Sequence, residues 1–419
     1  MTEVLPPGAL AGMLTGKPPR RDTFQGWQHY RTTRQQFTPA PQLTFAQWRV
    51  LSPHRRSLYD LHRTATHVNL PLQETPMSLK VSRLVNRRMR NNALKQKPAT
   101  RAGVMITGWG YQGKTETVCE VAASFEDAWL DMHDHLNPTA VAGTWDLHAP
   151  AVYVQTPVTA KPKSTCQAVL NFFGASVTNM NLPQMIQQVA QSLHDHGVKA
   201  LILDDITRLR MHRADDQDTL DLIRAFMSMN VTLVLVGVDI PGSGLLREAR
   251  WDGQTRQWVM PTSEHARVHG FETTQTERRF DLVELDHFRY TTPVEMTAFH
   301  DHLGGLESQL RLLKAEPGML TGGSMPEYLL RRTGGVVGLL ERLIEDGAQE
   351  AMDSGQEFLD EGLLDEIVIS LDDPARDPGA GEIPALPDGG RMASPSASRK
   401  GGRRRNGSFD DRGPRAAGG

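Results

Sequence analysis

The sequence has few cysteines, no excess charge of either sign and no long apolar run. Its 419 residues include two cysteines, Cys119 and Cys166, so a disulfide scaffold is excluded and a structural zinc site is not expected. The 46 basic and 49 acidic residues leave a net charge of −3, which excludes a globally basic protein but not a local basic patch. No run of about 18 apolar residues occurs, and the first residues lack a signal-peptide pattern. We expect a cytoplasmic protein that does not cross a membrane.

Charge is unevenly distributed, although the total is close to zero. Residues 75–115 contain nine basic side chains and no acidic one. Residues 340–373 contain twelve acidic side chains and one arginine. Two interpretations of these runs stay open: a pair of solvated helix faces, or a basic surface and an acidic surface with separate roles.

Short apolar runs alternate with helical stretches in the middle of the chain. The expected strands are 103–107, 151–155, 200–203 and 231–236, with 281–285 as a further candidate. The expected helices between them are 116–130, 165–173, 183–196 and 219–229. Because the runs are β-branched and end abruptly, they are typical of buried parallel strands. The alternation predicts an α/β fold with a parallel sheet flanked by helices.

One motif points to specific chemistry. Residues 108–115, Gly-Trp-Gly-Tyr-Gln-Gly-Lys-Thr, match the P-loop pattern G-x-x-x-x-G-K-[ST] between a predicted strand and a predicted helix. Glycines let the backbone N–H groups approach phosphate oxygens, and the helix N-terminus favours the same anion. Lys114 is expected to reach the β- and γ-phosphates of ATP, and the Thr115 hydroxyl a Mg²⁺ ion. The expected ATP-binding residues are Gly108, Gly110, Gln112, Gly113, Lys114, Thr115 and Glu116.

A P-loop also needs an acid at the end of a neighbouring strand, and two aspartates follow the run 200–203. Asp204 is expected to hold Mg²⁺, and Asp205 to polarise the attacking water as general base. The alternative is an Asp-Asp cap on the next helix or turn. Because most such ATPases carry the longer glutamate at the second position, we expect hydrolysis to be slow or dependent on geometry.

The rest of the chain divides into regions of different composition. We expect an extended arm over 1–44, a basic helical extension over 45–100 and the nucleotide-binding core over 101–290. An α-helical lid is expected over 291–371 and a disordered tail over 372–419. The expected lid helices are 293–315, 325–333, 336–353 and 359–370. The long segment between the fourth strand and Arg279 is expected to hold a helix or a hairpin.

The motifs together resemble the AAA+ ATPases of transposition, the TniB and TnsC group, with the Mu B protein and IstB as more distant relatives. The resemblance spans roughly residues 77–369. Its elements are the P-loop ending Gly-Lys-Thr-Glu116, Val154-Gln-Thr-Pro157, Leu203-Asp-Asp-Ile206, Leu235-Val-Gly-Val238, Thr276-Glu-Arg-Arg-Phe280 and Thr333-Gly-Gly-Val-Val-Gly-Leu339.

The resemblance implies an ATP-dependent factor that forms a homo-oligomeric ring or filament on double-stranded target DNA. It implies that the assembly recruits or activates a DDE-type transposase and is cleared by hydrolysis. Arg279 matches the family's arginine finger, which acts on a neighbouring subunit, and Arg278 is the adjacent candidate; a plain surface pair is the alternative. The chain departs from AAA+ patterns in two places. Asp239 is the polar candidate for the sensor after the fourth strand, and Gly338 stands where many AAA+ proteins have an arginine.

Two basic patches are candidates for DNA contacts. The first, within 80–101, has helical spacing and contains Lys80, Arg83, Arg87, Arg88 and Arg90. The second follows the acid pair and contains Arg208, Arg210 and Arg213. Contacts would be made to phosphates, so we expect weak sequence preference and strong salt dependence. An ordinary solvated face is the alternative for each patch.

Two other functions fit the same motifs. One is a helicase-loader-like ATPase of DNA metabolism. The other is a nucleotide-gated scaffold or signalling module that hydrolyses little ATP. The basic run at 80–101 counts against the second alternative, and Asp205 gives it weight.

Overall fold

The computed structural model describes residues 18–137, 148–158, 161–209, 217–243, 250–252, 257–259 and 276–369. All of them lie in one compact unit. Among these residues, no helix combines the length and the apolarity that crossing a membrane requires.

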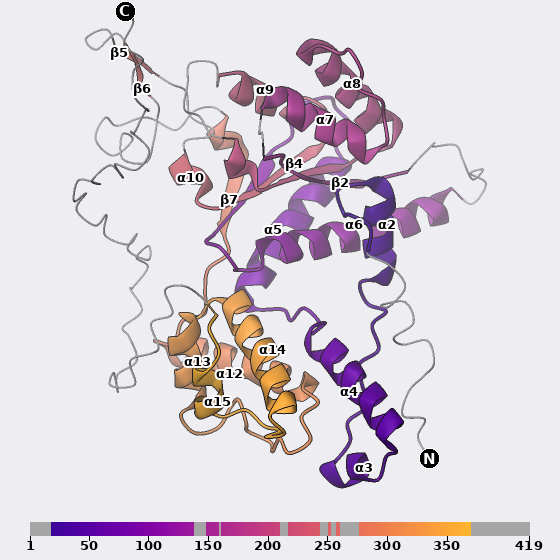
Figure 1. Ribbon diagram of the computed structural model, residues 1–419. Helices are drawn as coiled ribbons and strands as arrows, with labels where there is room; N and C mark the ends of the chain where they lie inside the picture. Colours follow the sequence, from indigo (N-terminus) through magenta and orange to yellow (C-terminus); the bar gives the residue numbers. More distant parts are fainter. Residues whose placement is uncertain are drawn as a thin grey trace, which may run out of the picture. The chain divides into compact units, whose positions relative to one another are not determined.

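A five-stranded parallel sheet forms the centre of this unit (Figure 1). Its strands are β1 (Gly103–Thr107), β2 (Ala151–Gln155), β3 (Ala200–Asp204), β4 (Thr232–Gly237) and β7 (Phe280–Glu284). The order across the sheet is β2-β3-β4-β1-β7, and every neighbouring pair is parallel. Strands β1, β3 and β4 are buried along their whole length, as their uninterrupted apolar runs predict. The predicted α/β fold is confirmed.

Helices cover the sheet where the sequence predicts them (Figure 1). They are α6 (Lys114–Leu136), α7 (Pro162–Phe172), α8 (Leu182–Asp195) and α9 (Gln217–Met227). Helix α8 shows why they begin where they do: Asn181 caps it, and its side chain and that of Gln184 each accept a hydrogen bond from the other's backbone N–H. A short helix α10 (Ile240–Ser243) follows β4. Strands β5 (Arg250–Asp252) and β6 (Gln257–Val259) pair antiparallel, so the insertion holds a hairpin.

The N-terminal region corrects one prediction. Residues 24–33, expected to be part of an extended arm, form helix α2 (Phe24–Thr33). Thr23 caps this helix by accepting a hydrogen bond from the Gly26 N–H, and Trp27 is fully buried in the core of the sheet domain. The segment is mostly polar, and a single buried tryptophan does not form the periodic apolar pattern from which a helix is predicted.

Three more helices precede the first strand. They are α3 (Phe45–Arg49), α4 (Pro53–His67) and α5 (Pro76–Ala93). Helices α4 and α5 both begin with proline, which fits the first turn of a helix because its missing N–H has no partner there. Val81, Val85 and Met89 lie along one side of α5 and are buried in the core.

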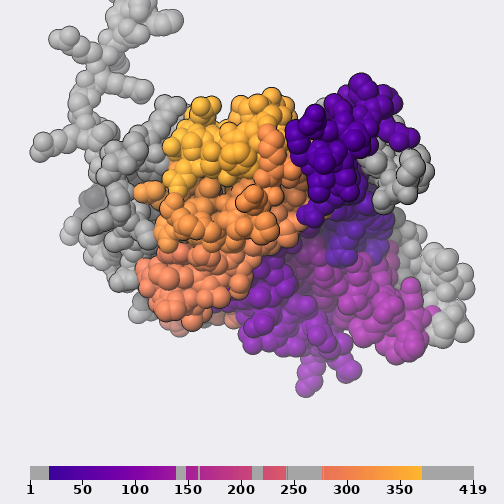
Figure 2. Space-filling view, turned by 90° about the horizontal axis from the view of Figure 1, so that it is seen from below, coloured from indigo at the N-terminus to yellow at the C-terminus, as the bar shows by residue number. Residues whose placement is uncertain are grey.

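The C-terminal region is helical. It consists of α12 (Pro293–Gln309), α13 (Met325–Thr333), α14 (Val337–Asp353) and α15 (Glu361–Asp365). Helices α12 and α15 are shorter than predicted. Helix α4 packs against this region, where the buried Arg63 guanidinium pairs with the Glu357 carboxylate at 2.7 Å. Figure 2 shows the N-terminal helices in indigo beside the C-terminal helices in yellow.

Candidate nucleotide site

The P-loop connects β1 to α6 and has the backbone geometry that its glycines predict. Gly113 has φ +74° and immediately precedes α6, in the left-handed region that favours glycine. A Cβ atom at Gly108 would lie 2.5 Å from the Leu285 carbonyl oxygen, so only glycine fits beside the end of β7. The loop therefore holds backbone N–H groups at the N-terminus of a 23-residue helix, which is the arrangement that binds phosphate.

Asp204, the last residue of β3, lies beside the P-loop. The Thr115 hydroxyl donates a hydrogen bond to Asp204 Oδ2 at 2.7 Å. The Tyr153 hydroxyl donates to the same oxygen at 2.8 Å, and the Asp205 backbone N–H donates to Asp204 Oδ1 at 2.8 Å. Asp204 is 3% exposed, so its carboxylate is held almost completely inside the protein by three donors.

Lys114 lies beside this acid pair. Its ammonium group donates a hydrogen bond to the Trp109 carbonyl oxygen within the P-loop. Burial lowers the pKa of Lys114, and the nearby Asp204 and Asp205 carboxylates oppose that shift. A bound anion such as phosphate would place further negative charge beside this half-buried ammonium group.

The residues present fit a magnesium ion. Thr115 and Asp204 offer a hydroxyl and a carboxylate, the hard oxygen ligands that Mg²⁺ uses together with waters and substrate phosphates. No group of three or more His, Cys, Asp or Glu side chains among the described residues could hold a metal by itself.

Asp205 is held differently from Asp204. It has φ +53°, and its carboxylate accepts a hydrogen bond from Gln155 Nε2 at 3.1 Å. Arg208 pairs with the same carboxylate at 2.9 Å and also donates to the Thr156 carbonyl oxygen. The carboxylate expected to act as general base thus has two side-chain partners.

Arg208 therefore lies in the nucleotide site itself, beside the Asp205 carboxylate. The two other arginines of the second predicted DNA patch, Arg210 and Arg213, lie outside the described residues.

The C-terminal helical region contacts the P-loop through Gly338. The Gly338 N–H donates a hydrogen bond to the Tyr111 carbonyl oxygen at 2.8 Å, and a Cβ at Gly338 would lie 2.5 Å from that oxygen. A Cβ at Gly335 would lie 2.1 Å from the Phe288 carbonyl oxygen. An arginine is therefore not accommodated where the AAA+ pattern has one. The buried Arg332 instead bonds within the lid to Tyr328.

Three remaining residues of the predicted ATP-binding set have informative surroundings. Gln112 is 4% exposed, and its Oε1 has no hydrogen-bond partner among the described residues. Gly110 has nothing within 4 Å of a hypothetical Cβ, so the tip of the loop is open. Glu116 is exposed and forms a bidentate pair with Arg21, a contact that no sequence pattern indicated.

The two candidate finger arginines lie at the opposite end of the strands from the P-loop. They belong to the short 3-10 helix η3 (Glu277–Arg279), immediately before β7, and both side chains are exposed. Strands β1 and β7 are parallel with Gly103 beside Phe280 and Thr107 beside Glu284. Because the P-loop follows Thr107, the arginines start about 13 Å along the strands from it, four residues at about 3.3 Å each. A residue that acts on another subunit's nucleotide has no need to lie near its own P-loop.

The predicted basic run lies on α5, and most of it forms one exposed stripe. Lys80, Arg83, Arg87 and Arg90 recur at intervals of three and four residues and are exposed, opposite the buried valines. Within the described part of the chain, none of the four has an ion-pair partner. Arg88 is the exception to the prediction: it pairs with Asp281 of β7, with 2.8 Å between Nε and Oδ2. We call Lys80, Arg83, Arg87 and Arg90 the basic stripe.

The chain is similar to known proteins in its central part. Residues 97–240 match the family described as AAA domain. No curated protein matches the sequence.

Several solved structures are similar to the chain. The Orc1 protein of Aeropyrum pernix in complex with DNA is 14% identical over 72% of this chain and 67% of that one, with a TM-score of 0.48. Cdc6p from Pyrobaculum aerophilum is 12% identical over 71% and 72%, with a TM-score of 0.41. AMPPCP-bound DnaA from Aquifex aeolicus is 15% identical over 68% and 65%, with a TM-score of 0.34.

The AAA-domain match covers β1, the P-loop, α6 and the acid-bearing strand β3. The five-stranded parallel sheet supplies the architecture around them. The chain therefore has the fold of an AAA+ P-loop NTPase, a parallel sheet flanked by helices and followed by a helical C-terminal region.

Proposed function

We propose that this chain is an ATP-dependent DNA-binding ATPase that assembles on target DNA and recruits or activates a DDE-type transposase. The observation that carries the ATPase part is the contact between Thr115 and Asp204. It brings the P-loop and the acid of β3 to hydrogen-bonding distance, beside the half-buried Lys114. Such a site is suited to a nucleoside triphosphate with Mg²⁺.

In the proposed mechanism, the P-loop N–H groups and Lys114 bind the phosphates of ATP. Thr115 and Asp204 would hold Mg²⁺, which supplies charge neutralisation when bound. Asp205 orients the attacking water and accepts its proton, with Gln155 and Arg208 fixing the carboxylate. Because these two partners also compete for the carboxylate, turnover by a single subunit is expected to be slow.

Assembly would complete the site. Arg279, or the adjacent Arg278, is proposed to reach the γ-phosphate of a neighbouring subunit, where its charge stabilises the transition state. Its place before the start of β7, at the opposite end of the strands from its own P-loop, supports a role in trans. Hydrolysis would then depend on the ring or filament.

The basic stripe is the proposed DNA surface. Its four cations span about 15 Å of α5, ten residues at about 1.5 Å each, and face solvent. Such a row neutralises phosphates without reading bases. Arg88 is not included in this surface because it pairs with Asp281. Arg208 is not included because it pairs with Asp205 in the nucleotide site.

Salt dependence of duplex binding tests the DNA surface. Arg87→Gln is expected to weaken binding equally on unrelated sequences and to reduce the slope of log K against log salt by about 1. Arg55→Gln, at an exposed position on α4, is the matched control and should leave the slope unchanged. Equal slopes for the wild type and the Arg87 variant would contradict the assignment.

The transposase partner rests on the sequence resemblance. A DDE transposase gene next to the gene for this chain is the expected observation, and a replicative helicase gene in that place would favour the helicase-loader alternative. The Asp205 carboxylate is paired with Arg208, and a general base that is already paired favours the scaffold alternative, in which little ATP is hydrolysed. That alternative requires ATP binding with no DNA-dependent turnover, which a hydrolysis assay with and without duplex measures.

A further inference from the structure

An arginine from the N-terminal segment lies at the phosphate end of α6. Arg21 Nη2 donates to Glu116 Oε1 at 2.8 Å, and Nη1 donates to Oε2 at 3.0 Å. Glu116 directly follows Thr115 in the first turn of the helix whose N-terminus faces the phosphates. The two residues are 95 positions apart in the sequence, so the fold itself brings this cation to the P-loop.

Two aromatic rings hold the guanidinium group in place. Its central carbon lies 5.1 Å from the centre of the Tyr30 ring and 5.9 Å from that of Tyr153. The Tyr153 hydroxyl in turn donates to Asp204. Arg21 is thus separated from Asp204 by one side chain, that of Tyr153, and 29% of its own side chain remains exposed.

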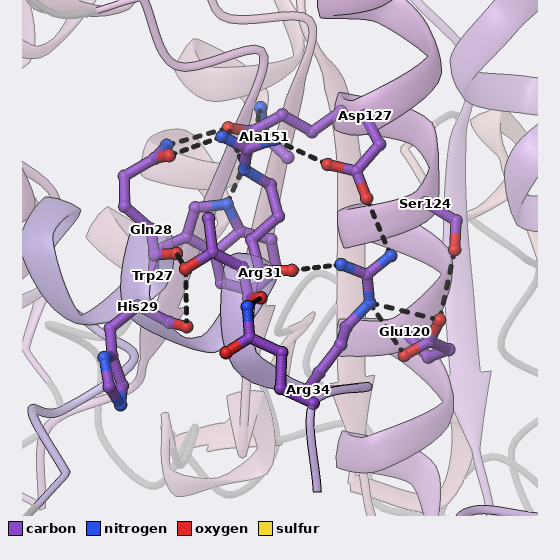
Figure 3. A network of polar contacts seen from close by, with 12 residues as sticks. Trp27, Gln28, His29, Arg31, Arg34, Glu120, Ser124, Asp127 and Ala151 are labelled. Carbon is purple, nitrogen blue, oxygen red and sulfur yellow. Dashed lines mark hydrogen bonds and ion pairs between the residues drawn. The ribbon is translucent and has the colours of Figure 1, made fainter. Parts of the chain in front are cut away.

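The helix that follows Arg21 is fixed to α6 by a network of charged and polar contacts (Figure 3). Trp27 Nε1 donates to the fully buried Glu126 at 2.7 Å. Arg34 bridges Glu120 and Asp127 at 3.2 and 2.7 Å. The network lies along α6, so it sets the position of the N-terminal segment relative to the P-loop helix.

The charge of Glu116 explains why a cation is needed here. A free carboxylate in the first turn of α6 would repel the phosphates that the same helix terminus attracts. Burial alone would lower the pKa of Arg21, but the hydrogen bonds to Glu116 hold it above its ordinary value, so the group stays charged. Among the described residues, Glu116 is the carboxylate that pairs with Arg21, and it accepts one hydrogen bond from each terminal nitrogen of the guanidinium group.

We propose that Arg21 is a nucleotide-positioning residue, supplied by the chain's own N-terminal segment, that binds the phosphate groups of ATP beside the P-loop. The inference rests on the proposed binding of ATP at Lys114 and Thr115, and it adds a cis cation to that site. It gives helix α2 a role: the docking network keeps Arg21 where the nucleotide enters.

Nucleotide affinity of the full chain tests the proposal, measured by titration with a fluorescent ATP analogue. Arg21→Met, which keeps the bulk of the side chain and removes its charge, is expected to weaken binding about tenfold. Arg21→Lys keeps the charge and should recover most of the affinity. Arg20→Ala is the matched control: Arg20 is exposed, pairs with Asp22, and should bind ATP as the wild type does.

A second background separates phosphate binding from mere neutralisation of Glu116. In Glu116→Gln protein, Arg21→Met should still weaken ATP binding by a similar factor. No loss in that background would overturn the proposal, because Arg21 would then act only on Glu116. A loss of affinity that follows the thermal stability of the nucleotide-free variants, with no rescue by lysine, would also overturn it.

Failure of the proposed function looks different. If Lys114→Ala binds ATP as tightly as the wild type, the P-loop is not the binding site and the proposed function fails. If Lys114→Ala loses binding while Arg21→Met retains it, only the inference about Arg21 fails.

Discussion

The Thr115 hydroxyl donates a hydrogen bond to the Asp204 carboxylate, with 2.7 Å between Oγ1 and Oδ2. This contact joins the end of the P-loop to the end of β3, two segments that lie 89 residues apart in the sequence. It holds both expected magnesium ligands in one place before a nucleotide arrives.

Tyr153 is predicted to orient Asp204. Tyr153→Phe removes the 2.8 Å hydrogen bond to the buried carboxylate and is expected to lower the free energy of unfolding by about 1.5–3 kcal/mol. ATP hydrolysis should fall more than ATP affinity, because the metal ligand loses its fixed orientation. Urea denaturation and steady-state hydrolysis measure the two effects. Tyr30→Phe is the control, since the Tyr30 hydroxyl makes no hydrogen bond among the described residues; equal effects of the two variants would contradict the assignment.

The lid contact at Gly338 is predicted to tolerate no side chain. Gly338→Ala places a Cβ 2.5 Å from the Tyr111 carbonyl oxygen, so the lid must move away from the P-loop. We expect weaker ATP binding and slower hydrolysis. Gly304→Ala, inside α12, is the matched control, because the nearest atom to the new Cβ would be 3.9 Å away. Alanine at this position should stabilise the helix by about 0.5–1 kcal/mol. Wild-type ATP affinity and turnover for Gly338→Ala would show that the contact has no functional role.

The trans position of Arg279 is tested by mixing two inactive proteins. Lys114→Ala lacks the nucleotide site, and Arg279→Ala lacks the proposed finger. In a mixture, subunits with an intact P-loop meet subunits with an intact finger, so hydrolysis should exceed that of either variant alone. The assay is steady-state ATP hydrolysis on duplex DNA at high protein concentration. Additive background rates, or wild-type turnover by Arg279→Ala alone, would rule out the assignment; the Arg278→Ala variant tells the two arginines apart.

Glu341 makes the stability of the lid depend on pH. Burial, with the carboxylates of Glu116 and Glu345 nearby, raises the pKa of Glu341 from 4.5 to about 7. The folded protein therefore binds this proton more tightly than the unfolded chain, and that stabilisation is lost as the pH rises from about 4.5 through about 7. Glu341→Gln should melt at an increasingly higher temperature than the wild type between pH 5 and pH 8. The exposed Glu350→Gln on the same helix is the control, and a constant difference across the pH range would contradict the prediction.

Local patterns in the sequence were sufficient for the centre of the site. The P-loop and the two aspartates each follow a buried parallel strand, and the carboxyl ends of parallel strands meet at one edge of the sheet, so Lys114, Thr115 and Asp204 could be placed together. The basic stripe followed from helical spacing alone. Arg88 did not, because its partner Asp281 belongs to a strand almost two hundred residues away.

Contacts between distant segments could not be predicted. Arg21 lies outside the motifs, and Tyr153 directly precedes the Val154–Pro157 element without belonging to it. Their roles arise only when α2 packs on α6 and β2. Helix α2 itself has mostly polar residues, so it is stabilised by Trp27 and by charge pairs rather than by an apolar face. The sequence shows a glycine at position 338, but it does not show that the Tyr111 carbonyl oxygen leaves no room there for a side chain.

The measurement that tests the central claim most directly is duplex-DNA affinity as a function of nucleotide. Fluorescence anisotropy with a labelled duplex should show tight, cooperative binding by the wild type in ATP and weak binding in ADP. Lys114→Ala should bind weakly in both. Equal affinity in ATP and ADP, or unchanged ATP-dependent binding by Lys114→Ala, would contradict the account.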